Sequence, residues 1–175
     1  MRSPGSFCSA SFTSEEIREA VESGLTDKID YIAINIDEAS ALADEDHDKT
    51  DKRAVVLAAI HKLQKSRKSI MVSVTGGREG SWCWDGKDLN HFRAIEIKAV
   101  STAGAGDAFF SGMLTGLALG LHLFEAQQLA SLIAGLSVTS PDTIHKGIDR
   151  HSLKQFIKTT DIKFSEKIIK LLEDK

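Results

Sequence analysis

Cysteine and proline are scarce in this sequence, which has two of each among 175 residues. Cys8 and Cys83 stand far apart, so the chain is not a small disulfide scaffold. So few cysteines fit a reducing compartment, and we expect a cytoplasmic protein. The two prolines exclude a proline-rich linker between domains. Because 42% of the residues are hydrophobic, we expect one domain with its own core over residues 1–175.

Long hydrophobic runs and a strong net charge are absent as well. The most apolar stretch, residues 108–121, is too short to cross a membrane and indicates a buried helix. Its glycines Gly112, Gly116 and Gly120 recur one helical turn apart, and we expect them to allow close packing of this helix on a sheet. The net charge of -3 offers no broadly basic surface. We therefore expect neither a membrane nor a nucleic acid as partner.

Buried strands and amphipathic helices alternate along the chain. The expected strands are 31–34, 69–74, 81–84 and 92–97, and the expected helices are 13–24, 37–43, 52–65, 105–119, 124–138, 152–157 and 165–172. The last two strands flank the turn Asp85-Gly86 and predict a hairpin, whereas residues 1–12 show no period and predict a loop. The pattern is typical of an α/β fold with a mainly parallel sheet and an antiparallel edge hairpin.

The segment Ser101-Thr102-Ala103-Gly104-Ala105-Gly106-Asp107 carries the clearest chemical signal. It follows a predicted strand and opens the helix expected from Ala105. The unpaired N–H groups and the dipole of a helix start attract anions, and glycines let the backbone approach a phosphate closely. Asp107, in the first helical turn, is then placed to accept a proton from an attacking hydroxyl. The alternative is that Asp107 is an ordinary first-turn acid stabilised by the helix dipole.

Two other phosphate-binding patterns do not fit this sequence. Phe109 stands where the pattern Gly-x-Gly-x-x-Gly needs its third glycine, which argues against a dinucleotide enzyme of another α/β class. No segment matches Gly-x-x-x-x-Gly-Lys-Ser/Thr, so the chain contains no P-loop of that type.

Residues 101–107 also resemble the C-terminal signature of the ribokinase-like (PfkB) carbohydrate kinases, which commonly reads Asp-Thr-x-Gly-Ala-Gly-Asp. The resemblance implies a three-layer α/β/α, Rossmann-like fold and phosphoryl transfer from ATP to a hydroxyl of a sugar or nucleoside. It implies that Gly104, Ala105 and Gly106 form an anion hole for the transferring group and that Asp107 is the general base. ATP, Mg²⁺ and a small sugar or nucleoside are the implied donor, metal and acceptor.

A second motif extends the resemblance. The segment Asn35-Ile36-Asp37-Glu38 resembles the family's Asn-x-x-Glu motif, which follows a strand and governs magnesium and phosphate binding. By resemblance, Asn35 takes part in nucleotide binding and Glu38 in metal binding, and a carboxylate after a strand can hold a hydrated Mg²⁺. Taken alone, such an Asn and Glu are also typical of an ordinary helix start.

Two weaker sequence features suggest further nucleotide-binding residues. Thr75-Gly76-Gly77, with Gly80 after it, resembles the family's turn that contacts nucleotide phosphate, so Thr75, Gly77 and Gly80 are candidate binding residues. A glycine pair after a strand is by itself also typical of a plain turn. Ser131 falls where the family lines its adenine pocket.

The sequence departs from the family pattern at two places. Ser101 stands where the family has an aspartate that helps hold a monovalent cation, so potassium activation is not implied. Family members are usually longer and begin with strands that carry sugar-binding residues and a lid, for which this sequence has no counterpart. We therefore expect the C-terminal portion of such a kinase, with a homo-oligomer or a missing N-terminal half covering an open sheet edge. A non-catalytic nucleotide-binding remnant and one half of a split kinase are the alternatives.

Overall fold

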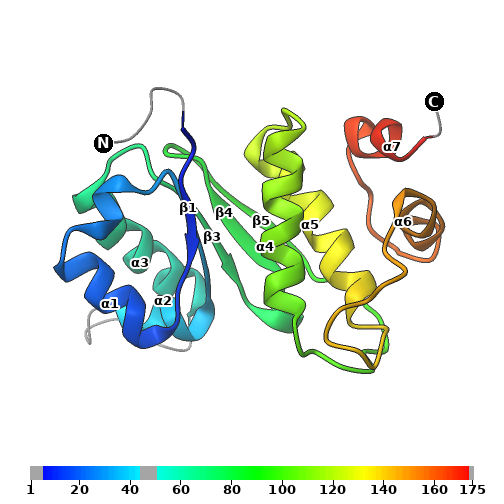
Figure 1. The fold of residues 1–175 in the computed structure, drawn as a ribbon, viewed down its shortest axis with the longest axis horizontal. Helices are drawn as coiled ribbons and strands as arrows, with labels where there is room; N and C mark the ends of the chain where they lie inside the picture. Colours follow the sequence, from blue (N-terminus) through cyan, green and yellow to red (C-terminus); the bar gives the residue numbers. More distant parts are fainter. Residues whose placement is uncertain (1–5, 44–50, 174–175) are drawn as a thin grey trace. The chain divides into compact units, whose positions relative to one another are not determined.

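The computed structural model describes residues 6–43 and 51–173, and Figure 1 shows its helices and strands. The strands are β1 (Ser9–Ser11), β2 (Tyr31–Asn35), β3 (Met71–Thr75), β4 (Ser81–Trp84) and β5 (Leu89–Phe92). The α-helices are α1 (Ser14–Glu22), α2 (Ile36–Leu42), α3 (Lys52–Ser66), α4 (Ala105–Ala118), α5 (Leu123–Ser137), α6 (Arg150–Ile157) and α7 (Glu166–Leu172). Two short 3-10 helices, η1 (Leu25–Lys28) and η2 (Gly77–Glu79), complete the chain.

The strands form one sheet in the order β1-β2-β3-β4-β5. β1 pairs with β2 and β2 pairs with β3 in parallel, so that Ala10 lies opposite Ile32 and Ile32 lies opposite Val72. The connections from β3 to β4 and from β4 to β5 are too short for a crossover, so these neighbours run antiparallel. The sheet therefore has the predicted parallel start and the predicted antiparallel hairpin at one edge.

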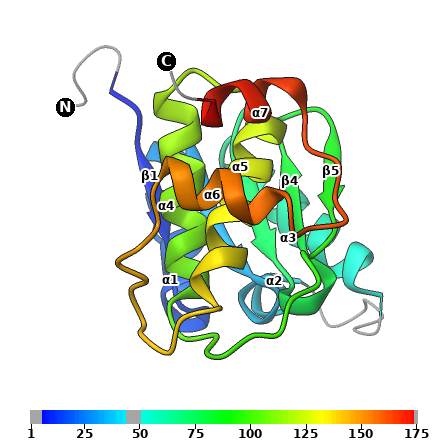
Figure 2. The same ribbon diagram turned by 90° about the vertical axis from the view of Figure 1, so that its right-hand side faces the viewer.

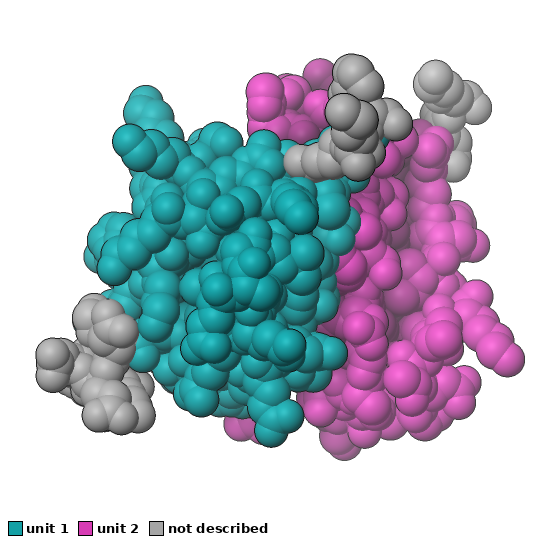
Figure 3. Space-filling view, turned by 60° about the vertical axis from the view of Figure 1, so that its left-hand side comes forward, with its two compact units in different colours: residues 1–76, 82–90 teal, residues 77–81, 91–175 magenta. Residues whose placement is uncertain are grey.

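Contacts divide the chain into two compact units, which Figure 3 shows in different colours. Unit 1 contains residues 1–76 and 82–90, and unit 2 contains residues 77–81 and 91–175. Each unit has its own cluster of buried apolar side chains. The single domain expected over residues 1–175 stays a prediction.

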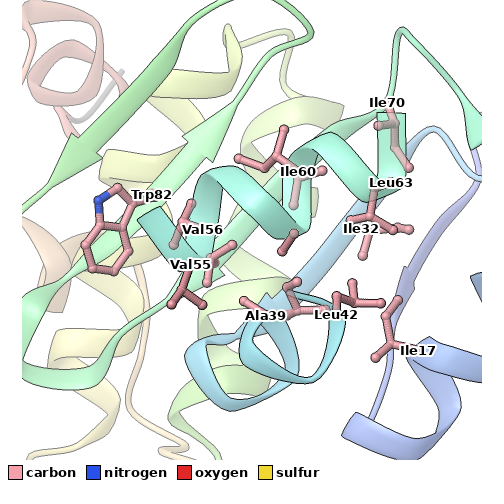
Figure 4. Close-up of a cluster of buried hydrophobic side chains, with 14 of the residues drawn as sticks. Ile17, Ile32, Ala39, Leu42, Val55, Val56, Ile60, Leu63, Ile70 and Trp82 are labelled. Atoms are coloured by element: carbon pink, nitrogen blue, oxygen red, sulfur yellow. The ribbon is translucent and has the colours of Figure 1, made fainter. Parts of the chain in front are cut away.

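Unit 1 is held together by an apolar cluster between its helices and one face of its strands (Figure 4). Each large aliphatic side chain in this cluster contributes about 1.5–3 kcal/mol through burial. The members are Ile17 of α1, Ala39 and Leu42 of α2, Val55, Val56, Ala59, Ile60 and Leu63 of α3, and Ile32, Ile34, Val72 and Val74 of β2 and β3, together with Ile29, Ile70 and Trp82. The alternation along β2 and β3 places these strand residues on one face of the sheet.

The opposite side of the same strands carries polar side chains that are also buried. The Tyr31 hydroxyl and Ser73 Oγ are hydrogen-bonded at 2.6 Å, and both residues are fully buried.

Cys83, on β4, is fully buried as well, and burial raises the pKa of its thiol well above the usual value. Because the thiolate is the reactive form, Cys83 is an inert packed residue.

Unit 2 contains the helix pair α4 and α5, with α6 and α7 packed on α5 (Figure 2). Gly112 and Gly116 let α4 approach α5 closely. A Cβ atom at Gly112 would lie 2.6 Å from Ala130 Cα, and one at Gly116 would lie 2.7 Å from Ala126 Cβ. The expectation of close helix–sheet packing is therefore corrected: within unit 2, these glycines serve helix–helix packing.

The sequence misplaces two strands. Residues 9–11 form β1 rather than part of a loop, because the Cys8 carbonyl accepts hydrogen bonds from the Asp30 and Tyr31 amides. The returning hairpin strand is Leu89–Phe92 rather than 92–97. Asp85 Oδ1 accepts hydrogen bonds from the amides of Lys87 and Asp88. These bonds close a short turn, so the returning strand begins at Leu89.

None of the described helices has the length and apolar character needed to cross a membrane.

The outer edge of β1 predicts association. Within residues 6–43 and 51–173, the only strand paired with β1 is β2. Because the Cys8 carbonyl faces β2, the pleat turns the backbone groups of Ser9 and Ser11 outward. We predict an assembly larger than a monomer by light scattering, and we expect Ser11→Pro to shift it toward monomer by removing an outward N–H group.

Ser14→Pro is the matched control. Ser14 is the first residue of α1, a position that tolerates proline, so this variant should keep the wild-type assembly. A wild-type chain that scatters as a monomer would contradict the prediction.

Candidate functional site

The first turn of α4 presents two backbone donors without partners among the described residues, whereas the Ala105 amide donates to the Thr102 carbonyl at 3.2 Å. Gly104 caps this helix with φ of 76° and ψ of 0°, and the first helical bond runs from the Ala108 amide to the Gly104 carbonyl at 2.9 Å. Among the described residues, no acceptor lies at the amides of Gly106 and Asp107. These donors add to the positive end of the α4 dipole, and together they favour an anion.

The two glycines of this loop have different structural roles. At Gly104 the left-handed φ favours glycine, and a Cβ atom there would clash with the carbonyl oxygen of Thr143. At Gly106 φ is not positive, and a Cβ atom would meet no other atom within 4 Å. Gly104 is therefore required by the fold of unit 2, whereas Gly106 has open space over its backbone where a phosphate can approach.

Asp107 is exposed in the first turn of α4. Within the part of the chain that the structure describes, its carboxylate makes no hydrogen bond or ion pair. An acid whose oxygens are free next to unpartnered amides can accept a proton from a bound hydroxyl.

The loop before α4 is tied to the end of α5. The amides of Val100 and Ser101 both donate to the Val138 carbonyl, at 2.8 and 3.2 Å. Ser101 Oγ accepts from the Ala103 amide at 3.3 Å. Together with the contact between Gly104 and Thr143, these bonds fix the loop from residues distant in sequence. No periodicity or motif could have identified Val138 and Thr143 in this supporting role.

In unit 1, the Asn-x-x-Glu segment forms a complete capping box at the start of α2. Asn35 Oδ1 accepts from the amides of Asp37 and Glu38 at 2.8 and 2.9 Å. In return, Glu38 Oε2 accepts from the Asn35 amide at 2.6 Å, and Glu38 Oε1 accepts from Asn35 Nδ2 at 2.9 Å. The ordinary helix-start interpretation of this motif is therefore realised in the structure.

The capping role leaves Glu38 able to take part in metal binding. Partial burial raises the pKa of its carboxyl, with added effects of the charges on Asp37 and Glu16, while the hydrogen bond from the Asn35 amide opposes the rise. Each carboxylate oxygen keeps a second lone pair. Mg²⁺ usually binds one or two carboxylates together with waters and phosphate oxygens, so one half-buried acid fits it. No cluster of three or more His, Cys, Asp or Glu suited to a metal occurs among the described residues.

Asn35 and Thr75 lie side by side at the ends of two parallel strands. They are partners in the register of β2 and β3, and each is the last residue of its strand. In α/β proteins, ligands bind outside the carboxyl ends of parallel strands. The structure thus brings together Asn35, Glu38 and Thr75 within unit 1.

The remaining predicted residues belong to unit 2. Gly77 has φ of 60° at the start of η2, with open space at its Cβ position. Gly80, with φ of 90°, is packed against the backbone of residues 92–94, so its absent side chain is a requirement of the fold. Ser131 lies in the middle of α5 and is partly buried. The loop at residues 104–107 also belongs to unit 2.

Comparison with known proteins defines the class. The family model of the pfkB family carbohydrate kinases matches residues 7–149, and the chain belongs to this family. It is 38% identical to a fructokinase from Escherichia coli over 85 residues, which cover 45% of this chain and 27% of that protein.

Solved structures support the same ribokinase-like α/β fold. Ribokinase II from E. coli in complex with ATP and Mg²⁺ has a TM-score of 0.72 at 20% identity, covering 89% of this chain and 49% of that one. An adenosine kinase from Sinorhizobium meliloti has a TM-score of 0.66 at 25% identity, covering 89% of this chain and 45% of the other. The chain thus spans less than half the length of these relatives.

The two glycines of the α4 loop yield a direct comparison. Gly104→Ala should lower the free energy of unfolding by about 2 kcal/mol or more, because a left-handed residue acquires a Cβ atom that clashes with Thr143. Gly106→Ala should leave it unchanged or raise it by up to about 1 kcal/mol through helix propensity. Urea unfolding of both variants measures the difference, and equal losses would show that the loop is not held as described.

Proposed function

We propose that this chain carries the nucleotide-binding and catalytic-base part of a kinase that transfers the γ-phosphoryl group of ATP to a hydroxyl of a sugar or nucleoside. The observation that carries the proposal is the first turn of α4, where exposed Asp107 stands beside the unpartnered amides of Gly106 and Asp107. Membership of the pfkB family supports the reaction class.

In this proposal, Asp107 acts on the acceptor. Its carboxylate takes the proton of the attacking hydroxyl while the hydroxyl oxygen bonds to the γ-phosphorus. The bond from that phosphorus to the bridging oxygen breaks, and ADP leaves with the electron pair. By the family resemblance, the amides of Gly104, Ala105 and Gly106 would stabilise the charge on the transferring group by donating hydrogen bonds to its oxygens. The Ala105 amide donates to the Thr102 carbonyl at 3.2 Å and would have to exchange that bond.

The strand ends of unit 1 supply the proposed metal and phosphate contacts. Glu38 would hold a hydrated Mg²⁺, which neutralises phosphate charge when bound. Asn35 keeps the Glu38 carboxylate oriented through its two hydrogen bonds. Thr75 of unit 1 would bind nucleotide phosphate. In unit 2, Gly77 would also bind phosphate, Gly80 shapes the turn that contains it, and Ser131 would line the adenine pocket.

The names of the relatives support a sugar or a nucleoside as the acceptor. The matches include a fructokinase and an adenosine kinase, one a sugar kinase and the other a nucleoside kinase by name. Donor and metal are proposed as ATP and Mg²⁺, the ligands of the Ribokinase II complex.

The general-base role predicts the effect of Asp107→Asn. We expect phosphoryl transfer from ATP to a panel of sugars and nucleosides to fall about 10²- to 10⁴-fold, because a carboxamide cannot accept the proton. Folding should be largely retained, with a loss of about 0.3–1 kcal/mol from the charge–dipole interaction at the start of α4. ATP affinity should be equal or higher, because a negative charge beside the phosphate site is removed. Asp27→Asn, an exposed acid in the first turn of η1, is the matched control.

Three outcomes of this experiment have distinct meanings. Transfer by the wild type that is lost in Asp107→Asn supports the kinase. ATP binding without any transfer supports the alternative of a non-catalytic remnant or of one half of a split kinase. Absence of ATP binding would contradict the phosphate site itself.

Two substitutions separate the capping and metal roles of Glu38. Glu38→Gln keeps an acceptor for the Asn35 amide but places a donor where Asn35 Nδ2 needs an acceptor, so one of the two bonds is lost. The raised pKa shows that the folded state disfavours the ionised carboxyl relative to the unfolded chain, and glutamine removes that penalty. The two effects oppose each other, so stability at pH 7 should fall by less than in Glu38→Ala. Glu38→Ala should lose about 1 kcal/mol through the broken capping box.

The metal dependence should respond differently from the stability. Both variants should need more Mg²⁺ for half-maximal phosphoryl transfer, or for ATP binding if transfer is absent. If Glu38→Gln keeps the wild-type Mg²⁺ requirement, Glu38 is a helix cap alone.

A further inference from the structure

A buried glutamine on α5 contacts the chain directly after η2. Gln127 is fully buried, and its Nε2 donates to the Ser81 carbonyl oxygen at 2.9 Å and to Ser81 Oγ at 3.1 Å. Ser81 is the first residue of β4 and is itself 2% exposed. Both residues belong to unit 2, as does the turn at residues 77–80 that precedes Ser81.

Other contacts hold the same turn. His91 Nε2 and the Glu79 carbonyl oxygen are hydrogen-bonded at 2.7 Å. Gly80 lies so close to the following chain that a Cβ atom there would be 2.6 Å from the Ala94 amide nitrogen. The turn is thus fixed by residues 91–94 and, at its end, by Gln127.

The choice of glutamine at this position needs a reason beyond packing. Its buried neighbours on α5 are apolar: Ala126, Leu129, Ala130 and Leu132. A leucine at position 127 would continue this pattern, whereas a buried amide is costly unless it is hydrogen-bonded. The double contact with Ser81 satisfies the Nε2 donor and fixes Ser81 to α5 within unit 2.

The location of Gln127 connects two parts of the proposed nucleotide site. Ser131 follows it by one turn on the same side of α5, because residues i and i+4 are neighbours on a helix. Gly77 and Gly80 lie in the turn that ends at Ser81. One side chain therefore links the helix proposed to line the adenine pocket with the turn proposed to bind phosphate.

We propose that Gln127 is a positioning residue, whose amide holds the turn at residues 77–80 in the conformation that binds nucleotide phosphate. This inference rests on the proposed function. Without the amide, the Ser81 carbonyl and hydroxyl lose a buried donor, and the turn populates other conformations. Apparent nucleotide affinity then falls in proportion to the binding-competent fraction.

The experiment compares Gln127→Leu with Gln128→Leu. Gln128 is the next residue on α5, and its Oε1 accepts from the Ser165 amide at 2.7 Å, just before α7. Each substitution removes one side-chain amide that binds a distant backbone group, but only one of them touches the turn. Calorimetric titration with ATP gives the dissociation constant, and hydrogen exchange of the free protein reports on the backbone of residues 77–81.

We expect Gln127→Leu to raise the ATP dissociation constant about tenfold and to speed amide exchange at residues 77–81. Gln128→Leu should speed exchange near residues 165–172 and leave ATP affinity at the wild-type value. In steady-state kinetics, the KM for ATP should rise more than kcat falls. If Gln127→Leu does not fold, Ser81→Ala removes the 3.1 Å contact alone and should weaken ATP binding about threefold.

Unchanged exchange at residues 77–81 in Gln127→Leu, or an equal loss of ATP affinity in both leucine variants, overturns the inference. Failure of the proposed function is recognised separately, since the wild type then binds no ATP although its exchange pattern at the turn still depends on Gln127. That result removes the nucleotide role and leaves Gln127 as a structural anchor.

Discussion

Backbone N–H groups at the start of a helix need an acceptor, and this requirement divides the helices of the chain. Side chains of Thr13, Asn35, Asp51, Asp149 and Ser165 accept such bonds at α1, α2, α3, α6 and α7, whereas the N-cap side chain of α5 accepts none. α4 begins at Gly104, which has no side chain to do so. The amides of Gly106 and Asp107, which have no acceptor among the described residues, are therefore available to an anion, and this is the physical basis of the candidate site.

The loop before α4 is held by contacts with distant residues although it is rich in glycine. Gly104 is held against Thr143, and the amides before it are bound to Val138. Preorganised donors stabilise developing charge better than donors that must move into place. At the strand ends of unit 1, the mutual bonds between Asn35 and Glu38 orient a carboxylate in the same manner. Motifs that also cap or turn the chain can thus carry chemistry because their structural role fixes the geometry.

Much of this arrangement could be predicted from the sequence, because the informative features are local. The helix expected from residue 13 and the helix opening after Gly104 depend on residues close together in the chain, and both occur as predicted. β1 could not be predicted, since a short strand of small polar residues exists only through its bonds to β2. The partners of Gly112 and the anchoring of Ser81 by Gln127 depend equally on contacts across many residues. Such contacts leave no periodic signal in the chain.

The division into units has a consequence for synthesis and dissection. Unit 1 consists of residues 1–76 and 82–90, while residues 77–81 belong to unit 2. The chain therefore passes between the units three times, and no single cut yields either one intact. On the ribosome, every residue of unit 1 has been translated once residue 90 is reached, so unit 1 can be completed first. Residues 77–81 must wait for α5 before their contacts within unit 2 can form, although the chain on both sides of them already belongs to unit 1.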